Sequence, residues 1–346
     1  MKKRIRDYGI IIGNGTPGRL NKITDVPGVK VGHTTINTER HKTGVTVILP
    51  CEDNPFTKKL TAAAYVHNGF GKTQGIPQIE ELGTMETPIA LTNTLNVGKV
   101  HDAVVDYMID WCRKDGTEVK SINPVIGECN DSSLNDIQER VIGIPEVQAA
   151  FASACEDFEE GAVGAGTGTI CFDCKGGIGS SSRLIEFDGK TYTLGVLVQS
   201  NFGRGGDLCL NGKRIGEEIL KKIQESELDK GSIMMIIATD LPVSDRQLKR
   251  IIKRAGAGLS RCGSYMGHGS GDIMLGFTTA NRIDSTAAEN LLDLQIMPEG
   301  KLEMAFRAAS DATEEAILNS LAAAETTVGY QGNIRYSLTD LYLKYL

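Results

Sequence analysis

Apolar and polar positions vary along the chain in a way that predicts both strands and helices, with no linker-like break between them. Apolar runs bounded by turn residues are typical of buried strands, and they occur at residues 44–50, 88–92, 123–131, 191–199, 232–240 and 267–275. Apolar residues at helical spacing predict helices at residues 97–111 and 302–324, and Ser244 is the expected N-cap of a basic helix that runs through Arg261. This mixture predicts one compact α/β domain with helices packed outside sheet.

The apolar segment that begins at Ser232 differs from the others in how it starts. A charged run at residues 225–230 ends at Gly231, and a nearly unbroken segment rich in Ile and Met follows. Ser232 therefore lies where a polar loop enters the core, directly after a residue without a Cβ atom. Glycine is favoured where the backbone bends sharply or is approached closely by another group. The pattern predicts a buried strand whose first residue is a serine.

A serine at this position can become a nucleophile at a new amino terminus. If the Ser232 hydroxyl attacks the Gly231 carbonyl, the peptide bond becomes an ester, which water can then hydrolyse. The new chain begins with Ser232 and carries an α-amine whose ordinary pKa of about 7.7–8.0 suits a general base at neutral pH. A Gly-Ser dipeptide is also common in ordinary turns, and the dipeptide alone leaves that alternative open.

Polar side chains also lie at the ends of other predicted strands. Asn201 follows one strand, and an amide there can donate a hydrogen bond to a developing oxyanion. Ser270 and Asp272 lie among glycines just before another strand, where a carboxylate can orient a hydroxyl or simply cap the glycine turn. Glu128 ends an apolar strand, where it can meet a substrate ammonium, take part in a capped turn or pair with a local Lys or Arg.

Two glycine-rich segments, at residues 161–169 and 175–183, raise the question of phosphate binding. The first contains a G-x-G-x-G pattern but lacks the G-K-[ST] of a P-loop. It also lacks a clear strand-then-helix frame with a distal acidic residue, which a dinucleotide site needs. We therefore interpret both segments as backbone that packs closely against other backbone.

Composition and charge narrow the class of protein. The chain has 346 residues, of which 40% are hydrophobic and 23% charged, as in a folded globular protein. A net charge of −7 argues against nucleic acid as a partner. One basic cluster has helical spacing, which is typical of a solvated helix face, and consists of Arg246, Lys249, Arg250, Lys253 and Arg254.

Targeting and metal-binding signals are weak. No apolar stretch approaches the roughly 20 residues of a membrane helix, and the apolar run near the start is too short for a signal peptide. We therefore expect a cytoplasmic protein without a membrane partner, whose eight cysteines are mostly reduced core thiols. Cys171 and Cys174 form one C-x-x-C without a second pair, and the five histidines lack metal-site spacing, so we expect no metal and no cofactor.

These segments together make the chain resemble the L-aminopeptidase/D-esterase (D-Ala-esterase/amidase) and β-peptidyl aminopeptidase family of self-cleaving serine hydrolases. The similarity spans almost the full length of the chain. Each motif is short and weak by itself, but so many motifs in the same order make the resemblance specific. They are residues 23–33 (ITDVPGVKVGH), 127–128 (GE), 166–168 (GTG), 175–179 (KGGIG), 199–203 (QSNFG), 231–232 (GS), 238–240 (ATD) and 269–272 (GSGD).

The resemblance implies a fold and a way of activation. The fold is a four-layer αββα sandwich that is similar to the N-terminal-nucleophile (Ntn) hydrolases, in a single domain over residues 1–346. The family implies self-cleavage into chains 1–231 and 232–346 and a homotetramer of such two-chain units. The implied substrates are small peptides, amides or esters with a free N-terminus, from which the enzyme releases N-terminal residues without a cofactor.

The resemblance also implies roles for individual residues. By position, Ser232 is the nucleophile, Gly231–Ser232 the cleaved bond and Asn201 a donor to the oxyanion. Ser270 and Asp272 position or activate the nucleophile. Glu128 meets the ammonium of the substrate.

One position departs from the family pattern. Asn130 stands where a family member has a tyrosine that helps to bind the oxyanion. Asparagine can also donate a hydrogen bond, but it is shorter, so the second oxyanion contact and the substrate range remain open.

Two other functions are consistent with parts of this pattern. An acyltransferase of the same architecture, such as ornithine acetyltransferase, also cleaves itself, but it uses a threonine where this chain has Ser232. A non-catalytic assembly protein that kept the fold is a second alternative. The joint presence of Ser232, Asn201, Ser270 and Asp272 argues against it.

Overall fold

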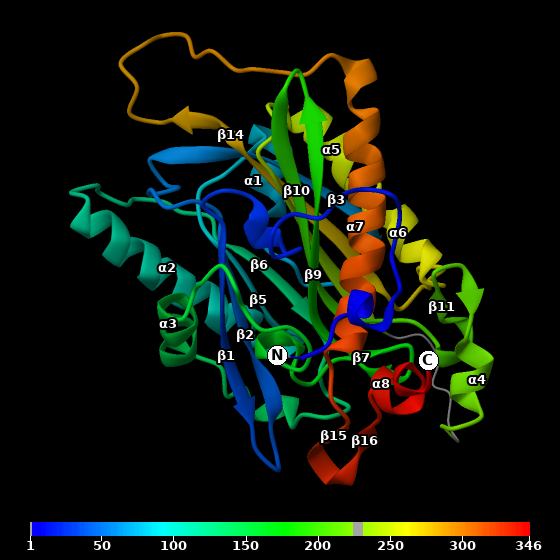
Figure 1. The fold of residues 1–346 in the computed structure, drawn as a ribbon. Helices are drawn as coiled ribbons and strands as arrows, with labels where there is room; N and C mark the ends of the chain where they lie inside the picture. Colours follow the sequence, from blue (N-terminus) through cyan, green and yellow to red (C-terminus); the bar gives the residue numbers. More distant parts are fainter. Residues whose placement is uncertain (1, 224–230) are drawn as a thin grey trace.

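The computed structural model describes residues 2–223 and 231–346, and its strands form two principal sheets that face each other (Figure 1). One sheet has the order β1–β2–β5–β6, with bounds Lys30–Asn37, Lys42–Leu49, Ile89–Asn93 and Val125–Cys129. The other has the order β4–β3–β14–β13–β10–β9, with bounds Thr84–Met85, Lys58–Gly69, Gly271–Asp284, Ser232–Thr239, Lys190–Asn201 and Gly177–Phe187. Within these sheets β5–β6 and β13–β14 are parallel pairs.

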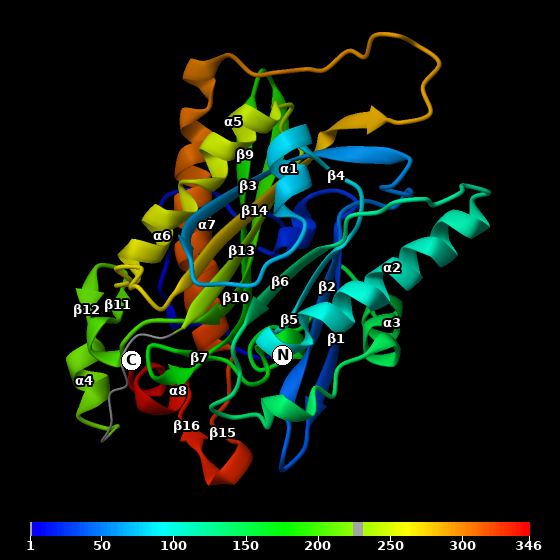
Figure 2. The same ribbon diagram turned by 180° about the vertical axis from the view of Figure 1, so that it is seen from behind.

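Helices cover the outer face of each sheet, which Figure 2 shows from behind. On the smaller sheet lie α2 (Val97–Lys114) and α3 (Ile144–Ala152), whose apolar residues share a core with that sheet. On the larger sheet lie α5 (Asp245–Ile252), α6 (Ala255–Arg261) and α7 (Glu303–Ala322). A third core fills the space between the two sheets. The layers are therefore helix, sheet, sheet and helix, as the expected αββα class requires.

Short elements connect these layers. The short helices are α1 (Ile76–Leu82), α4 (Gly216–Leu220) and α8 (Leu338–Leu341). The two-stranded pairs are β7 (Ile170–Cys171) with β8 (Cys174–Lys175), β11 (Cys209–Leu210) with β12 (Lys213–Arg214), and β15 (Thr327–Val328) with β16 (Ile334–Arg335).

Strand β13 is buried on both faces, which explains its nearly unbroken apolar sequence. Successive side chains of a strand point to opposite faces. Ile233 and Met235 therefore belong to the core under the helices, whereas Met234 and Ile236 belong to the core between the sheets. By the same alternation the Ser232 side chain projects toward the space between the sheets.

The sheets approach each other closely next to Ser232. A Cβ atom on Gly127 of β6 would lie 2.7 Å from the Cε atom of Met234, so a larger residue there would have to displace the Met234 side chain. Cys129 of β6 lies between the sheets, and its Sγ atom is 3.4 Å from the carbonyl oxygens of both Gln199 and Ser232. Burial raises the pKa of the Cys129 thiol well above its usual range, which keeps the thiol protonated as a donor.

Most predicted elements are confirmed. The expected strands correspond to β2, β5, β6, β10, β13 and β14, and the two expected apolar helices correspond to α2 and α7. Ser244 caps α5, because its side-chain oxygen accepts a hydrogen bond from the Gln247 N–H at 3.2 Å.

The prediction of one basic helix through Arg261 is wrong, because the segment forms the two helices α5 and α6. The break lies where α6 turns to pack against α7. A Cβ atom on Gly258 would lie 2.4 Å from the Ser310 carbonyl oxygen, and the Ser310 hydroxyl donates to the Arg254 carbonyl at 3.1 Å. Close packing on α7 therefore accompanies the break, and the Ser310 hydroxyl adds a second hydrogen bond to the Arg254 carbonyl, which also accepts from the Ala257 N–H at 3.0 Å.

The glycine-rich segments do pack backbone against backbone, as predicted. Gly161 and Ile178 exchange two backbone hydrogen bonds, of 2.7 and 2.9 Å. A Cβ atom on Gly166 would lie 2.5 Å from the Ile178 nitrogen. None of the eight cysteines forms a disulfide, and six are buried. Across residues 2–223 and 231–346 no helix is long and apolar enough to cross a membrane.

Candidate active site

Ser232 begins β13 and lies at the meeting point of three strands. In the antiparallel pair with β10 its direct partner is Asn201, and on the other side β14 runs parallel to it. The Gly271 N–H donates to the Ser232 Oγ atom at 3.2 Å. Ser232 is 7% exposed, so its hydroxyl is held by backbone yet open to a cavity.

Gly231 packs directly against the end of β10. A Cβ atom at this position would lie 1.8 Å from the Asn201 carbonyl oxygen, closer than any side chain allows. The glycine before the serine is therefore required by the approach of two backbones. The Gly231 carbonyl carbon and the Ser232 hydroxyl belong to adjacent residues at the edge of the same cavity.

Asn201 is oriented by the backbone of β7. The Ile170 N–H donates to the Asn201 Oδ1 atom at 2.9 Å, which settles which end of the amide is oxygen. The Nδ2 donors therefore face away from Ile170. Paired residues of an antiparallel ladder carry their side chains on the same face, so the Asn201 amide and the Ser232 hydroxyl are neighbours.

Ser270 and Asp272 form a buried pair at the start of β14. The Ser270 hydroxyl donates to the Asp272 Oδ1 atom at 2.9 Å, and both residues are almost fully buried. Asp272 pairs with Ile233 in the parallel ladder, one residue beyond Ser232. Asn68 of β3 holds the preceding turn by donating to the carbonyls of Gly267, at 2.8 Å, and of Ser270. The pair is thus fixed beside the start of β13.

Glu128 is held at the end of β6 by two neutral donors. Its Oε1 atom accepts a hydrogen bond from the Lys72 backbone N–H at 3.0 Å, and its Oε2 atom accepts one from the Thr94 hydroxyl. Glu128 is 3% exposed. It forms no ion pair with a lysine or arginine in the described part of the chain. The alternative that Glu128 pairs with a local Lys or Arg is therefore not found there.

Asn130 is exposed and lies two residues beyond Glu128. Its Oδ1 atom accepts a hydrogen bond from the Ser132 N–H at 3.0 Å, which makes a short turn within its own segment. The side chain lines the same cavity as Ser232.

One cavity of about 400 Å³ brings most of these residues together. Its lining includes Ser232, Gly231, Asn201, Ile170, Glu128 and Asn130. Ser270 and Asp272 are not part of the lining and lie buried beside it. A hydroxyl, an amide donor and an uncompensated carboxylate around a small cavity suit the binding and cleavage of a small cationic substrate.

Comparison with known proteins decides the family. The sequence model of peptidase family S58 matches residues 21–335 of the chain. The chain belongs to peptidase family S58. It is 40% identical to the β-peptidyl aminopeptidase BapA of Sphingosinicella microcystinivorans, over 95% of this chain and 88% of that protein.

Solved structures of high similarity support the same conclusion. The PH0078 protein of Pyrococcus horikoshii OT3 is 46% identical, with a TM-score of 0.93 over 99% of this chain and 98% of that one. The L-aminopeptidase D-Ala-esterase/amidase of Ochrobactrum anthropi is 33% identical, with a TM-score of 0.91 over 99% of both chains, and is described as a variant of the Ntn-hydrolase fold. The expected family, fold class and enzyme class, a serine-type aminopeptidase, are confirmed.

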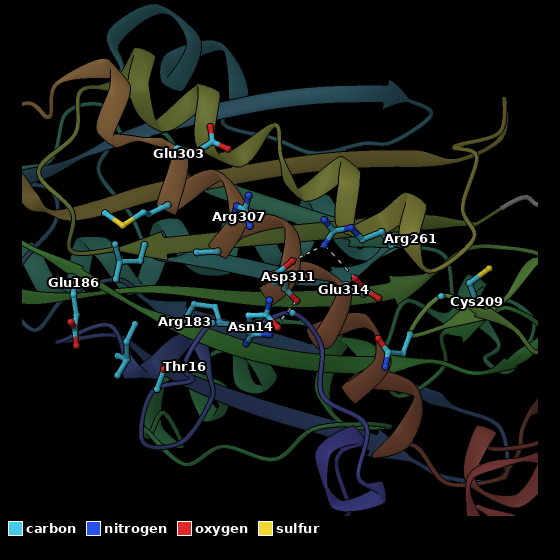
Figure 3. A pocket seen from close by; sticks show the side chains of 18 residues that line it. Asn14, Thr16, Arg183, Glu186, Cys209, Arg261, Glu303, Arg307, Asp311 and Glu314 are labelled. Atoms are coloured by element: carbon cyan, nitrogen blue, oxygen red, sulfur yellow. Dashed lines mark hydrogen bonds and ion pairs between the residues drawn. The ribbon is translucent and has the colours of Figure 1, made fainter.

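A larger cavity of the S58 peptidase, of about 1270 Å³, lies between the N-terminal segment, α6 and α7 and contains none of the candidate catalytic residues. Figure 3 shows Arg261 of α6 reaching Asp311 and Glu314 of α7 there, at 2.6 and 3.5 Å. The Arg261 guanidinium is thus paired with two carboxylates of the same cavity. Size alone therefore does not identify the reaction site, and the smaller cavity at Ser232 is the better candidate.

Several residues that build the site escaped sequence reasoning. Thr94 and Lys72 hold Glu128, Asn68 fixes the turn at Ser270, and Ile170 orients Asn201. The glycine-punctuated stretch at residues 68–71 was the one available signal, because such a stretch favours close approach to another group. No group of three or more His, Cys, Asp or Glu side chains suited to a metal ion occurs among the described residues.

Proposed function

We propose that this S58 peptidase activates itself by cleavage before Ser232 and then removes N-terminal residues from small peptides, amides or esters with a free amino terminus. The observation that supports this best is one small cavity shared by Gly231, Ser232, Asn201 and Glu128. It combines a scissile bond, a nucleophile, an oxyanion donor and a site for an ammonium group.

Activation begins with attack of the Ser232 Oγ atom on the Gly231 carbonyl carbon. The C–N bond breaks as a C–O ester forms, and the proton lost by the hydroxyl ends on the released α-amine of Ser232. Water then hydrolyses the ester, which leaves a carboxylate on Gly231 and restores the hydroxyl. The products are chains 1–231 and 232–346, and Ser232 now carries both a hydroxyl and an amine.

The mature reaction uses the same hydroxyl on a substrate carbonyl. The Ser232 amine, with an ordinary pKa of about 7.7–8.0, accepts the hydroxyl proton and returns it to the leaving group. The Asn201 Nδ2 donors stabilise the negative charge of the tetrahedral intermediate. Water then cleaves the acyl-enzyme ester and releases the N-terminal residue as a free acid.

Ser270 and Asp272 are assigned to the proton path around the new amine. The Ser270 hydroxyl donates to Asp272 at 2.9 Å, which fixes its orientation. The lone pairs of the Ser270 oxygen are then left to accept a hydrogen bond from another donor. A buried carboxylate behind it favours a positively charged amine nearby. The pair therefore stabilises the protonated amine that forms when Ser232 attacks.

Glu128 is assigned to the substrate ammonium. Its carboxylate already accepts from Lys72 and Thr94 but has no cation against it in the described part of the chain. A charge-assisted hydrogen bond to an incoming ammonium is stronger in this sheltered position than in bulk water. Asn130, at the exposed rim of the cavity, is assigned to contact the substrate beyond the scissile bond.

The assembly and the compartment are also part of the proposal. We infer a homotetramer of two-chain units from the family, and a cytoplasmic location from the eight cysteines, none of which forms a disulfide. Light scattering on the purified enzyme measures the mass of the assembly. We expect the mass of four two-chain units.

Mass spectrometry of the purified protein tests the central claim. We expect two chains that meet between Gly231 and Ser232, and a single inactive chain for Ser232→Ala. The cleaved enzyme should hydrolyse unblocked aminoacyl p-nitroanilides, amides or esters and leave their N-acetylated forms nearly untouched. An intact wild-type chain with full activity would contradict self-cleavage, and equal turnover of blocked and unblocked substrates would contradict the aminopeptidase assignment.

A further inference from the structure

Lys175 of β8 is a fully buried lysine in the wall behind the active site. Its side chain is 0% exposed, and its Nζ atom donates to the carbonyl oxygens of Gly166 at 3.0 Å, of Thr169 at 2.8 Å and of Gly176 at 2.8 Å. No carboxylate lies within ion-pair distance of this nitrogen in the described part of the chain. The Lys175 Nζ atom is thus surrounded by backbone carbonyls.

The hydrogen bonds favour the charged form of Lys175. Burial lowers the pKa of this lysine to about 7, with a further contribution from Lys2. Three carbonyls at hydrogen-bond distance require three N–H donors, and only the ammonium has three. An isolated buried charge is costly, and fixing a loop alone could be achieved with neutral groups. The question is therefore why a charged lysine is buried next to the cavity at Ser232.

One peptide group connects Lys175 to Asn201. The carbonyl of Thr169, which accepts from Lys175, and the N–H of Ile170, which donates to the Asn201 Oδ1 atom at 2.9 Å, belong to the same peptide unit. Ile170 is also the direct partner of Lys175 in the β7–β8 ladder. A continuous chain of hydrogen bonds thus runs from the ammonium through a backbone amide to the candidate oxyanion donor.

We propose that Lys175 is a positioning residue that orients and polarises Asn201 through the Thr169–Ile170 peptide. A cation at the carbonyl oxygen withdraws electron density from the amide and makes the Ile170 N–H a stronger donor. That bond in turn polarises the Asn201 side-chain amide, whose Nδ2–H groups become stronger donors to an oxyanion. The Lys175 charge thereby stabilises the tetrahedral intermediate through Asn201, without contacting the intermediate itself.

This arrangement acts on the transition state more than on substrate binding. The negative charge on the substrate oxygen develops only as the tetrahedral intermediate forms, so a polarised donor gains most at that stage. Lys175 does not line the cavity at Ser232 and does not touch the substrate. Its loss should therefore reduce kcat while KM changes little.

Lys175→Met, which keeps a similar length without the charge, is the primary test. On the fully cleaved fraction, with an unblocked aminoacyl p-nitroanilide, we expect kcat to fall by about tenfold to a hundredfold and KM to stay within about twofold. Affinity for an aminoalkyl boronate, which forms a tetrahedral adduct with Ser232, should fall with kcat. Lys22→Met is the matched control, because Lys22 is also buried but pairs with Asp157 at 2.7 Å, away from the site. It should leave kcat unchanged.

A double-mutant cycle separates the proposed path from loop stability. If Lys175 acts through Asn201, then Lys175→Met should cost little further rate in an Asn201→Ala background. An unchanged kcat in Lys175→Met, a change confined to KM, or fully additive losses would each overturn the proposal.

A measurement on the wild type covers the case in which Lys175→Met fails to fold or to cleave. Lysine labelled with ¹⁵N should give a protected ammonium signal from Lys175 at the pH of maximal activity, and the signal should shift when the boronate adduct forms. A neutral Lys175 at that pH overturns the proposal. The inference rests on the proposed role of Asn201: a wild type without peptidase activity would remove that function, whereas an active wild type with an unaffected Lys175→Met removes only the role of Lys175.

Discussion

Asn201 and Ser232 lie directly opposite each other at the ends of β10 and β13, with their side chains on the same face of the sheet. This pairing is set by the register of two long strands, so the distance between amide and hydroxyl is fixed by backbone hydrogen bonds. The Ile170 N–H then fixes the rotation of the amide. The proposed oxyanion donor is thus oriented before a substrate arrives, which is the condition for strong electrostatic stabilisation.

Removing the Asn201 amide should therefore reduce turnover strongly. We expect Asn201→Ala to lower kcat by about 10²–10³-fold, with a smaller change in KM, because the donor acts on charge that forms only in the intermediate. Asn130→Ala is the matched control in the same cavity and should lower kcat less. Steady-state kinetics on both cleaved variants measure this, and equal losses would mean that Asn130 shares the oxyanion.

Gly231 should tolerate no side chain. A Cβ atom there would meet the Asn201 carbonyl at 1.8 Å, so Gly231→Ala must move the backbone that carries the proposed cleavage site. We expect this variant to remain largely uncleaved after purification, as followed by mass spectrometry. Gly98→Ala in α2, where a Cβ atom meets nothing within 4 Å, should cleave like the wild type. Normal cleavage of Gly231→Ala would show that the backbone relaxes at no cost to the reaction.

Local patterns predicted the parts of the site that depend on strand ends. Three candidate residues lie where an apolar run meets glycine or polar residues, namely Ser232, Asn201 and Asp272. Such a boundary can be recognised from the adjacent residues alone. Register then brought them together in one sheet. The two-sided burial of β13 was equally predictable from its unbroken apolar run.

Long-range contacts left no such pattern. Thr94 and Lys72 reach Glu128 from 34 and 56 residues away, and only the folded sheets bring them to it. The break between α5 and α6 depends on packing against α7, which helical periodicity does not contain. Lys175 lies in a glycine-rich motif from which only close backbone packing was predicted. Its hydrogen-bond partners are backbone carbonyls, and because every residue has one, the sequence does not indicate which carbonyls it contacts.

The Ser270–Asp272 pair should matter for rate more than for stability. Asp272→Asn keeps the shape but removes the charge that favours a protonated amine near Ser270. We expect turnover to fall by at least about tenfold, which corresponds to about 1.4 kcal/mol of barrier, with a small change in melting temperature. Unchanged turnover, together with a lower melting temperature, would return Asp272 to a turn-capping role.

Acid should destabilise the fold through His33 of β1. Its Nε2 atom lies 3.1 Å from the Glu159 carbonyl and must donate, so the Nδ1 atom accepts from the Thr46 hydroxyl at 2.9 Å. Thr46 in turn accepts from the Ala165 N–H at 3.1 Å. Burial lowers the pKa of His33 from 6.5 to about 4, and the bond to the Glu159 carbonyl, which favours the protonated ring, does not offset this effect.

The sign of the pH dependence follows from this lowered pKa. Between about pH 6.5 and 4 the unfolded chain binds the His33 proton and the folded chain does not, so stability falls as pH falls, by up to about 1.4 kcal/mol per pH unit. Denaturant unfolding in the single-chain Ser232→Ala background measures the slope. His33→Gln should flatten it in this window, and an unchanged slope would assign the acid sensitivity to other groups.

Glu128 should make the enzyme dependent on a free amino terminus. Its carboxylate is 3% exposed, is held by Lys72 and Thr94, and faces the same cavity as Ser232. A substrate ammonium bound there places the scissile carbonyl at the nucleophile, so losing the contact should reduce rate as well as binding.

Glu128→Gln keeps the shape and the acceptor oxygen but removes the charge. We expect kcat/KM for an unblocked aminoacyl p-nitroanilide to fall by about tenfold or more, as for the loss of one charge-assisted hydrogen bond. The already slow turnover of the N-acetylated substrate should change little, because that substrate has no ammonium to lose. The ratio of the two values of kcat/KM is therefore the measurement. A Glu128→Gln enzyme that slows on both substrates by the same factor would show that Glu128 supports the fold of the cavity, since a structural defect does not distinguish a free amine from a blocked one.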